Sequence, residues 1–368
     1  MPPRKPPKNI FISSIHQNAG KTTISLGLHK ALLERRLKTM FLKPIGQEVV
    51  DVGSAKVDKD SYLISAVYHR GRLAKDMSPV TIGRGYTEKY IFNPQKDRIR
   101  KPIEQSFKKL TKGKDAIIVE GTGHAGVGSV IDWSNADVAR LLGSKVIIVS
   151  GGGIGRSIDE IMLNKALFDQ CGVDVLGVIV NKVRSEKFDK IARSLKQGLK
   201  NKGVKLLGVV PVDPLLSAPT VDQVQMRLEC NVLCGHENLH RRVHNTIVAA
   251  MEPHNMIGYL QDHTLVITSG DRVDNILLAV SSHLTSNRSG SHVSGIILTG
   301  RLQPNPQIVD LLKNSQIPVL STSDDTYNVA AKLENLICKI QKTDKDKIQE
   351  AARLVKRYVD VSEILNGC

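Results

Sequence analysis

The sequence predicts an α/β protein in which a doubly wound, mainly parallel sheet is followed by a second, smaller α/β domain. Two observations lead to this prediction. Through the first half of the chain, short runs rich in valine, isoleucine and leucine alternate with segments of helical periodicity, as expected for parallel strands buried on both faces. The tripeptide Gly20–Thr22 lies between the first such run and the first helical segment, where a phosphate-binding loop stands in a sheet of this kind.

Each element of the first domain follows from this alternation. Ligands of a doubly wound sheet bind beyond the carboxyl ends of its strands, so the residues that follow each strand are the first candidates for a site. The expected strands are 9–15, 38–45, 115–121, 145–151 and 175–183, and the expected helices are Lys21 to Leu33, Asp60 to His69, Ile103 to Leu110, Asn135 to Leu142 and Ile158 to Cys171.

The alternation of strand and helix candidates changes near residue 207, where Pro211, Pro214 and Pro219 mark the expected start of the second domain. Strand and helix candidates then recur on a smaller scale, and the chain ends in an amphipathic segment that we expect to form a helical brace. The predicted organisation is a disordered basic N-terminus at 1–8, a nucleotide-binding domain at 9–206, a second domain at 207–328 and C-terminal helices at 329–368.

Composition narrows the classes of function. The chain has 368 residues, and 52 Lys+Arg against 36 Asp+Glu give a net charge of +16, which favours an anionic partner. The basic residues are scattered and only 4% of residues are aromatic, so we rank nucleic acid last among such partners. Five cysteines without paired spacing and the absence of a long apolar run predict a cytoplasmic protein with reduced thiols and no membrane contact.

The loop between the first strand and the first helix departs from the usual Walker A pattern at one position. That pattern has glycine six positions before the lysine, where this chain has Ile15. The remaining part still wraps backbone N–H groups around a phosphate, and a loop one residue longer can turn without the missing glycine. We therefore predict that the loop binds a nucleotide phosphate, through Ser14, Asn18, Gly20, Lys21, Thr22 and Thr23.

Residues 13–47 resemble the start of the dethiobiotin synthetase-like P-loop proteins, whose loop carries this extra residue and whose second strand ends in Lys-Pro. They resemble more closely the N-terminal, non-catalytic region of long phosphotransacetylases and their stand-alone relatives. Further matching stretches are VDKDSYLI, SPVTIGRGYTEKY, IIVEGTGHAGVGSVIDWSNADVARLL, GGGIGRSIDE and GVIVNKV, and the second domain resembles the DRTGG family through ITSGDRVDNI and ILTGRLQP. The resemblance implies a P-loop NTPase-type fold with ATP and Mg²⁺ as cofactors.

Residue by residue, the resemblance to dethiobiotin synthetase implies that Lys21 contacts the β- and γ-phosphates and that Thr22, Asp60 and Glu120 surround Mg²⁺. One or two carboxylates with phosphate oxygens and water are the ligands that Mg²⁺ prefers. Asp58 is an alternative to Asp60, because either residue is also an ordinary helix cap.

Further candidates follow other strands. Lys43 ends the second strand, where its charge can meet the γ-phosphate or an anionic substrate, and Lys43 and Glu120 are the candidate catalytic residues. Asn181 matches the residue that hydrogen-bonds adenine, although asparagine at a strand end is also a turn residue. His124 is a candidate acid or base, or a turn residue, and Arg84 is a candidate phosphate clamp.

In the second domain, Asp271-Arg272 and Thr299-Gly300 match the elements for which the DRTGG family is named, and Arg301 replaces the last glycine. A side chain at that position puts a close approach of the backbone in question. DRTGG domains accompany nucleotide-sensing and metabolic-control domains, which implies a regulatory or interaction role. A domain that only packs or dimerises is the alternative.

A group of cysteines and histidines between residues 230 and 244 raises the question of a zinc site. Its spacing argues against a structural zinc site, which favours close thiol pairs. We instead expect a helix at 237–251 with one apolar face. The residues concerned are Cys230, Cys234, His236, His240 and His244.

We predict a nucleotide-responsive regulatory or sensor protein related to the regulatory part of phosphotransacetylase. The transferase domain of the long enzymes would follow residue 368, so we expect at most slow ATP hydrolysis and no phosphate acetyltransferase activity. The alternative is an ATP-dependent ligase or carboxylase acting on a small carboxylate or amine. The expected partners are a nucleotide, a small anionic metabolite, a metabolic enzyme and a second copy of the chain.

Overall fold

The computed structural model describes residues 6–53, 55–285, 292–336 and 338–368. They form two compact units, and we describe each by itself. Unit 1 holds residues 1–213 and 340–368, and unit 2 holds residues 214–339. The chain therefore leaves unit 1, builds unit 2 and returns. Of the N-terminal segment expected to be disordered, residues 1–5 lie outside the described residues, and Lys8 already begins the first strand.

Unit 1 is built on a six-stranded sheet with the order β10-β9-β8-β1-β7-β2, in which every neighbouring pair is parallel. The central strands are buried along almost their whole length, as their aliphatic sequences require. This confirms the predicted doubly wound α/β fold. The strands are β1 (Lys8–Ser14), β2 (Thr39–Leu42), β7 (Ala116–Glu120), β8 (Lys145–Ser150), β9 (Val175–Val183) and β10 (Leu206–Pro211), with the small pairs β3 (Ile45–Gly46) and β6 (Val80–Thr81), and β4 (Val49–Val52) and β5 (Ala55–Asp58).

Helices cover both faces of this sheet. The connection from β1 to β2 runs along the sheet in the opposite direction to the later ones, and parallel connections are right-handed, so α1 lies on the opposite face from α4, α5, α6 and α7. The helices of unit 1 are α1 (Lys21–Glu34), α2 (Lys59–Val67), α3 (Tyr86–Phe92), α4 (Lys96–Thr111), α5 (Asn135–Leu141), α6 (Gly155–Gln170), α7 (Phe188–Lys200), α14 (Lys345–Tyr358) and α15 (Val361–Gly367).

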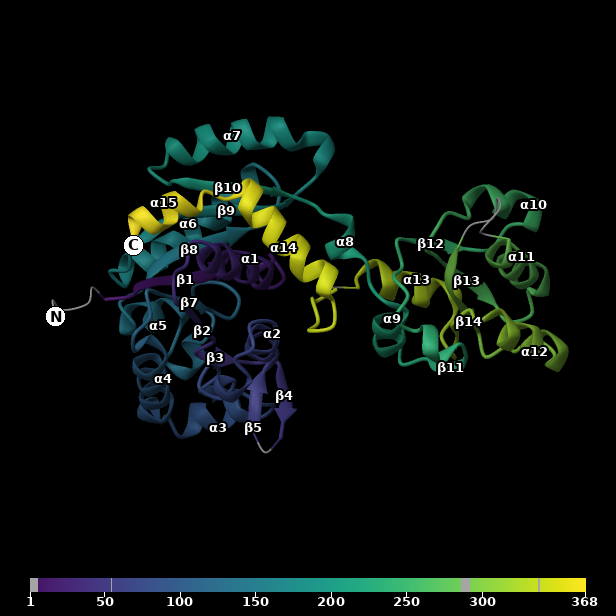
Figure 1. Ribbon diagram of the computed structural model, residues 1–368, viewed down its shortest axis with the longest axis horizontal. Coiled ribbons are helices and arrows are strands. Elements are labelled where there is room, and N and C mark those ends of the chain that lie inside the picture. Colours follow the sequence, from purple (N-terminus) through teal and green to yellow (C-terminus); the bar gives the residue numbers. More distant parts are fainter. Residues whose placement is uncertain (1–5, 54, 286–291, 337) are drawn as a thin grey trace. The chain divides into compact units, whose positions relative to one another are not determined.

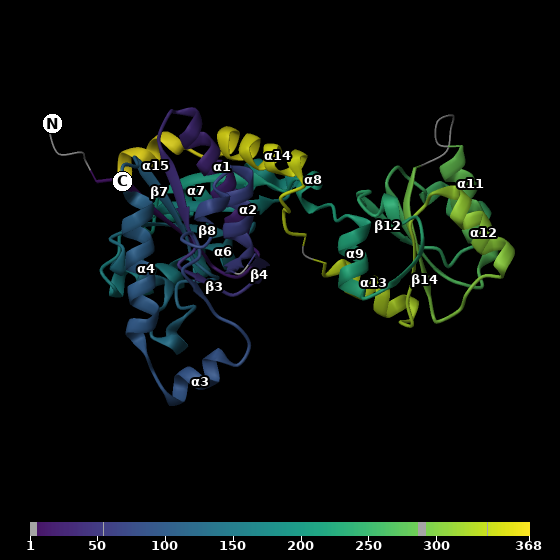
Figure 2. The same ribbon diagram turned by 60° about the horizontal axis from the view of Figure 1, so that its bottom comes forward.

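The C-terminal helices complete the α1 face. Figures 1 and 2 show α14, in yellow, alongside α1, and α14 and α15 also contact β10. Gly27 permits the close approach, because a Cβ atom there would lie 2.4 Å from Val355 Cγ2. Val359, between the two helices, pairs with Gly208 of β10.

The structure differs from the expected boundaries of unit 1 in two places. Residues 206–211, which the sequence analysis gave largely to the second domain, form the edge strand β10, because they pair with β9. The change of unit comes at Pro214, and of the expected C-terminal helices only those after Ile340 belong to unit 1. α4 also begins before its expected start and contains Pro102.

Unit 2 has a five-stranded sheet with the order β11-β15-β14-β13-β12, in which only β11 runs antiparallel to its neighbour (Figure 1). Two apolar clusters lie against this sheet, one including Ile276 of α11 and Leu312 of α12 and the other Val224 of α9 and Val329 of α13. The elements are α8 (Pro214–Ser217), α9 (Val221–Leu228), β11 (Asn231–Cys234), β12 (Asn245–Val248), α10 (Pro253–Met256), β13 (Thr264–Ser269), α11 (Val273–Leu284), β14 (Val293–Thr299), α12 (Pro306–Ser315), β15 (Val319–Ser321) and α13 (Thr326–Glu334).

The helix expected at 237–251 is wrong. A short 3₁₀ turn at His236–Asn238 is followed by strand β12, which pairs with β13 from Asn245↔Thr264 to Val248↔Ile267. Because β12 gains backbone hydrogen bonds from a strand distant in sequence, the pairing overrides the local helical periodicity. Among the described residues, no helix is long and apolar enough to cross a membrane.

Candidate functional site

The loop between β1 and α1 turns without a glycine at position 15, because its start continues the sheet. The backbone N–H groups of Ser14 and Ile15 donate to the carbonyls of Gly123 (3.2 Å) and Val149 (3.1 Å). The left-handed backbone that glycine would allow is instead needed later, at Asn18 (φ 63°) and Gly20 (φ 100°). The departure from the Walker A pattern thus leaves the turn itself intact.

Gly20 is required by packing as well as by its backbone angle. A Cβ atom there would lie 2.1 Å from Nδ2 of Asn181, which donates to the carbonyl of Ala19 at 3.0 Å. The next residue, Lys182, donates to the carbonyl of Asn18 at 2.8 Å. The structure therefore places the Asn181 amide against the phosphate loop, a contact that the sequence analysis did not anticipate.

The N-terminus of α1 faces the loop and suits an anion. Within the described residues, no side chain caps this helix and its first turn holds no acidic residue, so its dipole and first N–H groups are not neutralised by a carboxylate. Lys21 is 8% exposed and donates from Nζ to Ser14 Oγ at 2.9 Å. Ser14 Oγ also lies 2.7 Å from the carbonyl of His16 and 3.0 Å from that of Gly123. Thr23 lies half-buried in the first turn.

Next to Lys21, the structure brings together four predicted site residues from different elements, which we call the charge cluster: Thr22, Lys43, Asp60 and Glu120. The Lys43 ammonium lies 2.7 Å from Asp60 Oδ2 and 3.0 Å from Glu120 Oε1. The Thr22 hydroxyl lies 3.0 Å from Asp60 Oδ1 and 3.3 Å from Glu120 Oε1. The side chain of Glu120 is fully buried and that of Lys43 is 5% exposed.

These ionisable groups perturb one another. Burial alone would lower the pKa of Lys43, but the carboxylates of Asp60, Glu120 and Asp58 outweigh it and raise that pKa above its usual value. Burial raises the pKa of Glu120, and the charge of Asp60 adds to this, against the opposite effects of Lys43 and Lys21. Such a shift, produced by burial together with specific charged partners, is common at functional sites.

The structure separates the roles of the two candidate aspartates. Asp58, 2% exposed, accepts a hydrogen bond from the Asp60 backbone N–H at 2.9 Å and so caps α2. Asp60 turns its carboxylate toward Thr22 and Lys43. Burial and the nearby Asp60 raise the pKa of Asp58, although Lys43 opposes the rise. Asp60 is thus the aspartate of the charge cluster.

One residue of this region was missed from the sequence. Ser25 of α1 is fully buried and donates to Glu120 Oε2 at 2.6 Å. Residues three or four apart share one face of a helix, so the spacing from Lys21 and Thr22 was the available signal.

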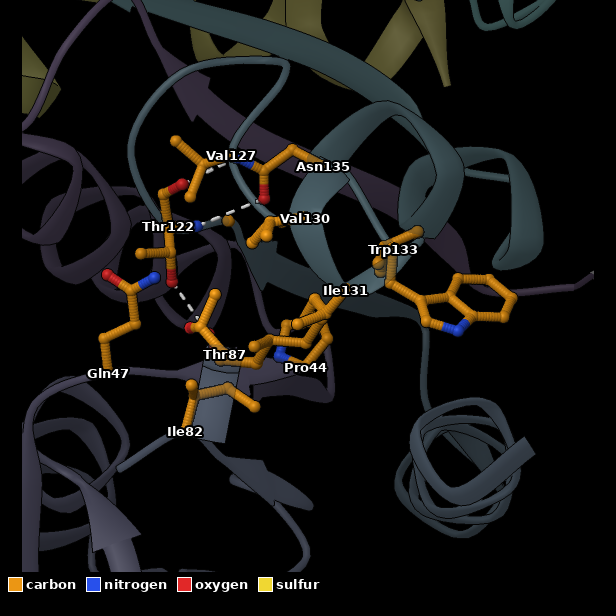
Figure 3. Close-up of a pocket in the computed structure, with 14 residues that line it drawn as sticks. Pro44, Gln47, Ile82, Thr87, Thr122, Val127, Val130, Ile131, Trp133 and Asn135 are labelled. Atoms are coloured by element: carbon orange, nitrogen blue, oxygen red, sulfur yellow. Dashed lines mark hydrogen bonds between the residues drawn. The ribbon is translucent and has the colours of Figure 1, made fainter. Parts of the chain in front are cut away.

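A pocket of about 140 Å³ adjoins the charge cluster, because Pro44 and Gly121 of its wall directly follow Lys43 and Glu120 in the chain. Figure 3 shows Val130, Ile131, Ile82 and Pro44 gathered around it, with Gln47 at one side. Its polar wall is internally bonded, since Thr122 N donates to Asn135 Oδ1 at 3.2 Å. The lining residues are Pro44, Ile45, Gln47, Ile82, Thr87, Gly121, Thr122, Val127, Gly128, Val130, Ile131, Trp133, Asn135 and Val138.

Two further candidate residues, His124 and Arg84, have surroundings that differ from those of the charge cluster. His124 is exposed, and its Nδ1 accepts a hydrogen bond from the N–H of Gly126 at 3.2 Å, as a turn residue does. Arg84 is exposed in the turn before α3.

The DRTGG-like residues of unit 2 lie at the carboxyl ends of the neighbouring strands β13 and β14 and form hydrogen bonds with neighbouring segments of the same unit. Arg272 pairs with Asp274 at 2.9 Å and donates to the carbonyls of Ala250 (3.1 Å) and Met251 (3.0 Å). The buried Thr299 hydroxyl lies 2.8 Å from that of Thr326.

At the position of the last glycine, Arg301 adopts a left-handed backbone with φ 60°, next to Gly300 at φ 77°. The close backbone approach occurs elsewhere, at Gly270, where a Cβ atom would lie 1.8 Å from the carbonyl oxygen of Leu302. In the residues with described placement, no three His, Cys, Asp or Glu side chains gather in a way that would hold a metal ion.

Comparison with known proteins finds two family matches. Residues 8–220 match the family described as AAA domain, and residues 223–336 match the DRTGG domain.

Several curated relatives match almost the whole chain. The phosphate acetyltransferase of Nitratidesulfovibrio vulgaris is 30% identical over 366 residues, which cover 97% of this chain and 51% of that protein. Those of Synechocystis and Pseudomonas putida are 26% and 29% identical and are covered to 51% and 52%. The chain thus spans about half the length of the phosphate acetyltransferases it matches.

Among solved structures, the MinC:MinD cell division protein complex of Aquifex aeolicus gives a TM-score of 0.38 at 17% identity, covering 57% of this chain and 83% of that chain. The CBS and DRTGG domains of the regulatory region of Clostridium perfringens pyrophosphatase, complexed with the activator diadenosine tetraphosphate, give 0.27 at 16% identity, with coverage of 46% and 83%.

Proposed function

The chain belongs to the AAA domain family and carries a DRTGG domain, and from this premise we propose that unit 1 binds ATP with Mg²⁺ and that the protein is a nucleotide-responsive regulator. The observation that supports this most strongly is the meeting of Lys21, the N-terminus of α1 and the buried charge cluster at one edge of the sheet. A helix N-terminus and a lysine suit phosphate oxygens, and a hydroxyl with two carboxylates suits Mg²⁺.

The residues present fit Mg²⁺. Its preferred ligands are oxygens, and Thr22, Asp60 and Glu120 offer hydroxyl and carboxylate oxygens within one hydrogen-bonded group. The Lys43 ammonium already lies between the two carboxylates, which indicates that the cluster favours a cation. Thr22, Asp60 and Glu120 would hold the ion, and bound Mg²⁺ would neutralise phosphate charge.

The other residues would bind and orient the nucleotide. The N–H groups at the start of α1 and Lys21 would contact phosphate oxygens, and Gly20 would let the backbone approach them. Asn181 and Lys182 would hold the loop in shape through the carbonyls of Ala19 and Asn18. Asp58 would fix the start of α2 and hence the position of Asp60.

A regulatory role is supported by the way unit 2 is built into the chain. It begins three residues after the last residue of β10, and the chain re-enters unit 1 shortly before α14, which packs on α1. One connection thus follows the edge strand β10, and the other leads to α14, which packs on the helix that begins at the proposed nucleotide site. The match of this chain to half of each phosphate acetyltransferase further suggests a kinship with the part of those proteins outside the transferase.

The test is calorimetric titration of the full chain with ATP–Mg²⁺. Lys21→Ala and Glu120→Ala should each weaken binding at least about 100-fold, because each removes a buried charge from the site. Lys187→Ala, a matched change at an exposed lysine, should bind as the wild type does. Binding without phosphate release would agree with the regulator, and wild-type protein that does not bind ATP would refute the proposal.

The pocket in Figure 3 favours a second function, an ATP-dependent ligase or carboxylase acting on a small carboxylate or amine. Its apolar wall would enclose the body of the acceptor and leave the reacting group toward Lys43 and Glu120. In that case, phosphate release should rise when small carboxylates or amines are added. Val127→Phe, which would fill the pocket, should abolish the rise and leave ATP binding unchanged.

A further inference from the structure

Lys43 occupies the centre of the charge cluster. Its ammonium lies 2.7 Å from Asp60 and 3.0 Å from Glu120, and its side chain is 5% exposed, so it meets these carboxylates largely shielded from water. The fully buried carboxylate of Glu120 and the half-buried one of Asp60 (19% exposed) would repel each other strongly in such surroundings without a cation. Lys43 thus offsets the repulsion between the two carboxylates in the protein without ligand.

The oxygens that hold Lys43 are also those proposed to hold Mg²⁺. Glu120 Oε1 accepts from both Lys43 and Thr22, and Asp60 turns one oxygen to each of them. An ammonium group and a divalent ion at the same oxygens would lie only a few ångströms apart, where like charges in a buried site repel strongly. Both cations therefore compete for the same place.

We propose that Lys43 is the resident counter-ion of the cation site, and that a divalent cation binds only when the Lys43 ammonium leaves Asp60 and Glu120. This inference rests on the proposed function, because it concerns how the ATP–Mg²⁺ site is entered. No covalent bond is made or broken in the exchange: the hydrogen bonds of the Lys43 ammonium to Asp60 and Glu120 are lost, and the same carboxylate oxygens would coordinate the divalent cation.

The exchange would make Mg²⁺ binding depend on nucleotide. Free Mg²⁺ must displace a paired ammonium that would then lose its partners, whereas nucleotide phosphates would give the ammonium new anionic partners. The lysine side chain has a long flexible stem, which allows the ammonium to move while the backbone stays in place before Pro44. The site would thus respond to Mg²⁺ together with nucleotide and remain closed to Mg²⁺ alone.

The test measures metal binding without nucleotide, by titrating the full chain with MnCl₂ and following free Mn²⁺ by electron paramagnetic resonance. Wild-type protein should bind Mn²⁺ weakly, and Lys43→Met should bind one ion at least about tenfold more tightly, because the competing charge is gone. Lys43→Arg, which keeps the charge, should behave as the wild type. A Lys43→Met variant that binds Mn²⁺ no better than the wild type would overturn the inference.

Two controls separate this exchange from other effects. Lys182→Met removes a charge near the loop but not from the cluster and should gain no Mn²⁺ binding, while Lys43→Met with Glu120→Gln should lose the gain. If Lys43→Met is poorly folded, MnCl₂ should raise its melting temperature by several degrees, about the effect of a ligand well above its Kd, and absence of this rise would overturn the inference. Binding of ATP–Mg²⁺ by the wild type is measured separately, so a failure of the proposed function can be distinguished from a failure of this inference.

Discussion

The carboxyl edges of the two sheets both carry charged motif residues, but they hold them in opposite ways. In unit 1, Lys43 and Glu120 are 5% and 0% exposed, and they converge with side chains from other elements. In unit 2, the Arg272–Asp274 pair is 33% and 43% exposed, and Arg272 is occupied by nearby carbonyls. An exposed pair contributes little to stability, whereas buried charges oppose folding unless they are matched closely. The comparison favours the carboxyl edge of unit 1 over the DRTGG-like residues as the place of the proposed ligand site.

A row of three histidines, exposed or half-buried, lies at the other edge of the sheet of unit 2. His244, His263 and His292 immediately precede β12, β13 and β14, and their rings lie 4.6 and 5.2 Å apart in that order. Burial is the main cause of the lowered pKa of His244 and His292. These histidines lie at the opposite ends of the strands from the DRTGG-like residues.

The largest expected difference between the two units is the effect on ATP–Mg²⁺ binding of replacing one glycine in each. Gly20→Ala should weaken ATP–Mg²⁺ binding at least about 100-fold, because the new methyl group would meet Asn181 and deform the phosphate loop. Gly300→Ala has a similar backbone angle but open space around it, so it should lose only about 1 kcal/mol of stability and keep full ATP binding. Calorimetry and urea unfolding measure both, and equal ATP binding by the two variants would contradict the comparison.

Acidification should lower the stability of unit 1 through His29. This side chain is 2% exposed on α1, and burial, followed by the charge of Arg70, lowers its pKa from 6.5 to about 3. A group with a lowered pKa contributes stability above its unfolded pKa that is lost as pH falls. Unit 1 should therefore lose about 2–3 kcal/mol between pH 6.5 and 4.5, and His29→Leu should lose less.

The fluorescence of Trp133, the single tryptophan of the chain, follows the unfolding of unit 1 in urea at each pH. His283→Leu, in unit 2, is the matched control. Burial, with Arg241 and His292, lowers the pKa of His283 to about 4, but this change lies outside unit 1 and should leave the Trp133 transition equally sensitive to pH. The same pH dependence in the wild type and His29→Leu would argue against the role of His29.

The smallest effect is expected at Arg301. Its φ of 60° is strained for a residue with a Cβ atom, so Arg301→Gly should stabilise unit 2 by about 0.5–1 kcal/mol. Urea unfolding followed by circular dichroism measures this gain, and ATP binding should not change. A loss of stability would mean that the Arg301 side chain makes a contribution larger than the strain.

Much of the fold could be predicted because its signals are local. Apolar runs placed the central strands of the first sheet, and helical periodicity placed α1, α2, α5 and α6 to within a few residues. β12 could not be found in this way, because its strand conformation depends on pairing with β13, 19 positions along the chain from Asn245 to Thr264. The boundary at 214 likewise depends on β10 pairing with β9.

The order of the elements and the residue types of the phosphate loop can be read from the amino-acid sequence alone, since both depend on neighbours a few residues apart. Which side chains meet depends on the tertiary fold. The register that pairs Ile12 with Glu120 and Leu42 with Val119 brings Glu120 beside the ends of β1 and β2, and the cap formed by Asp58 turns Asp60 toward Lys43. A charge cluster of this kind is a property of long-range strand pairing, which local periodicity does not encode.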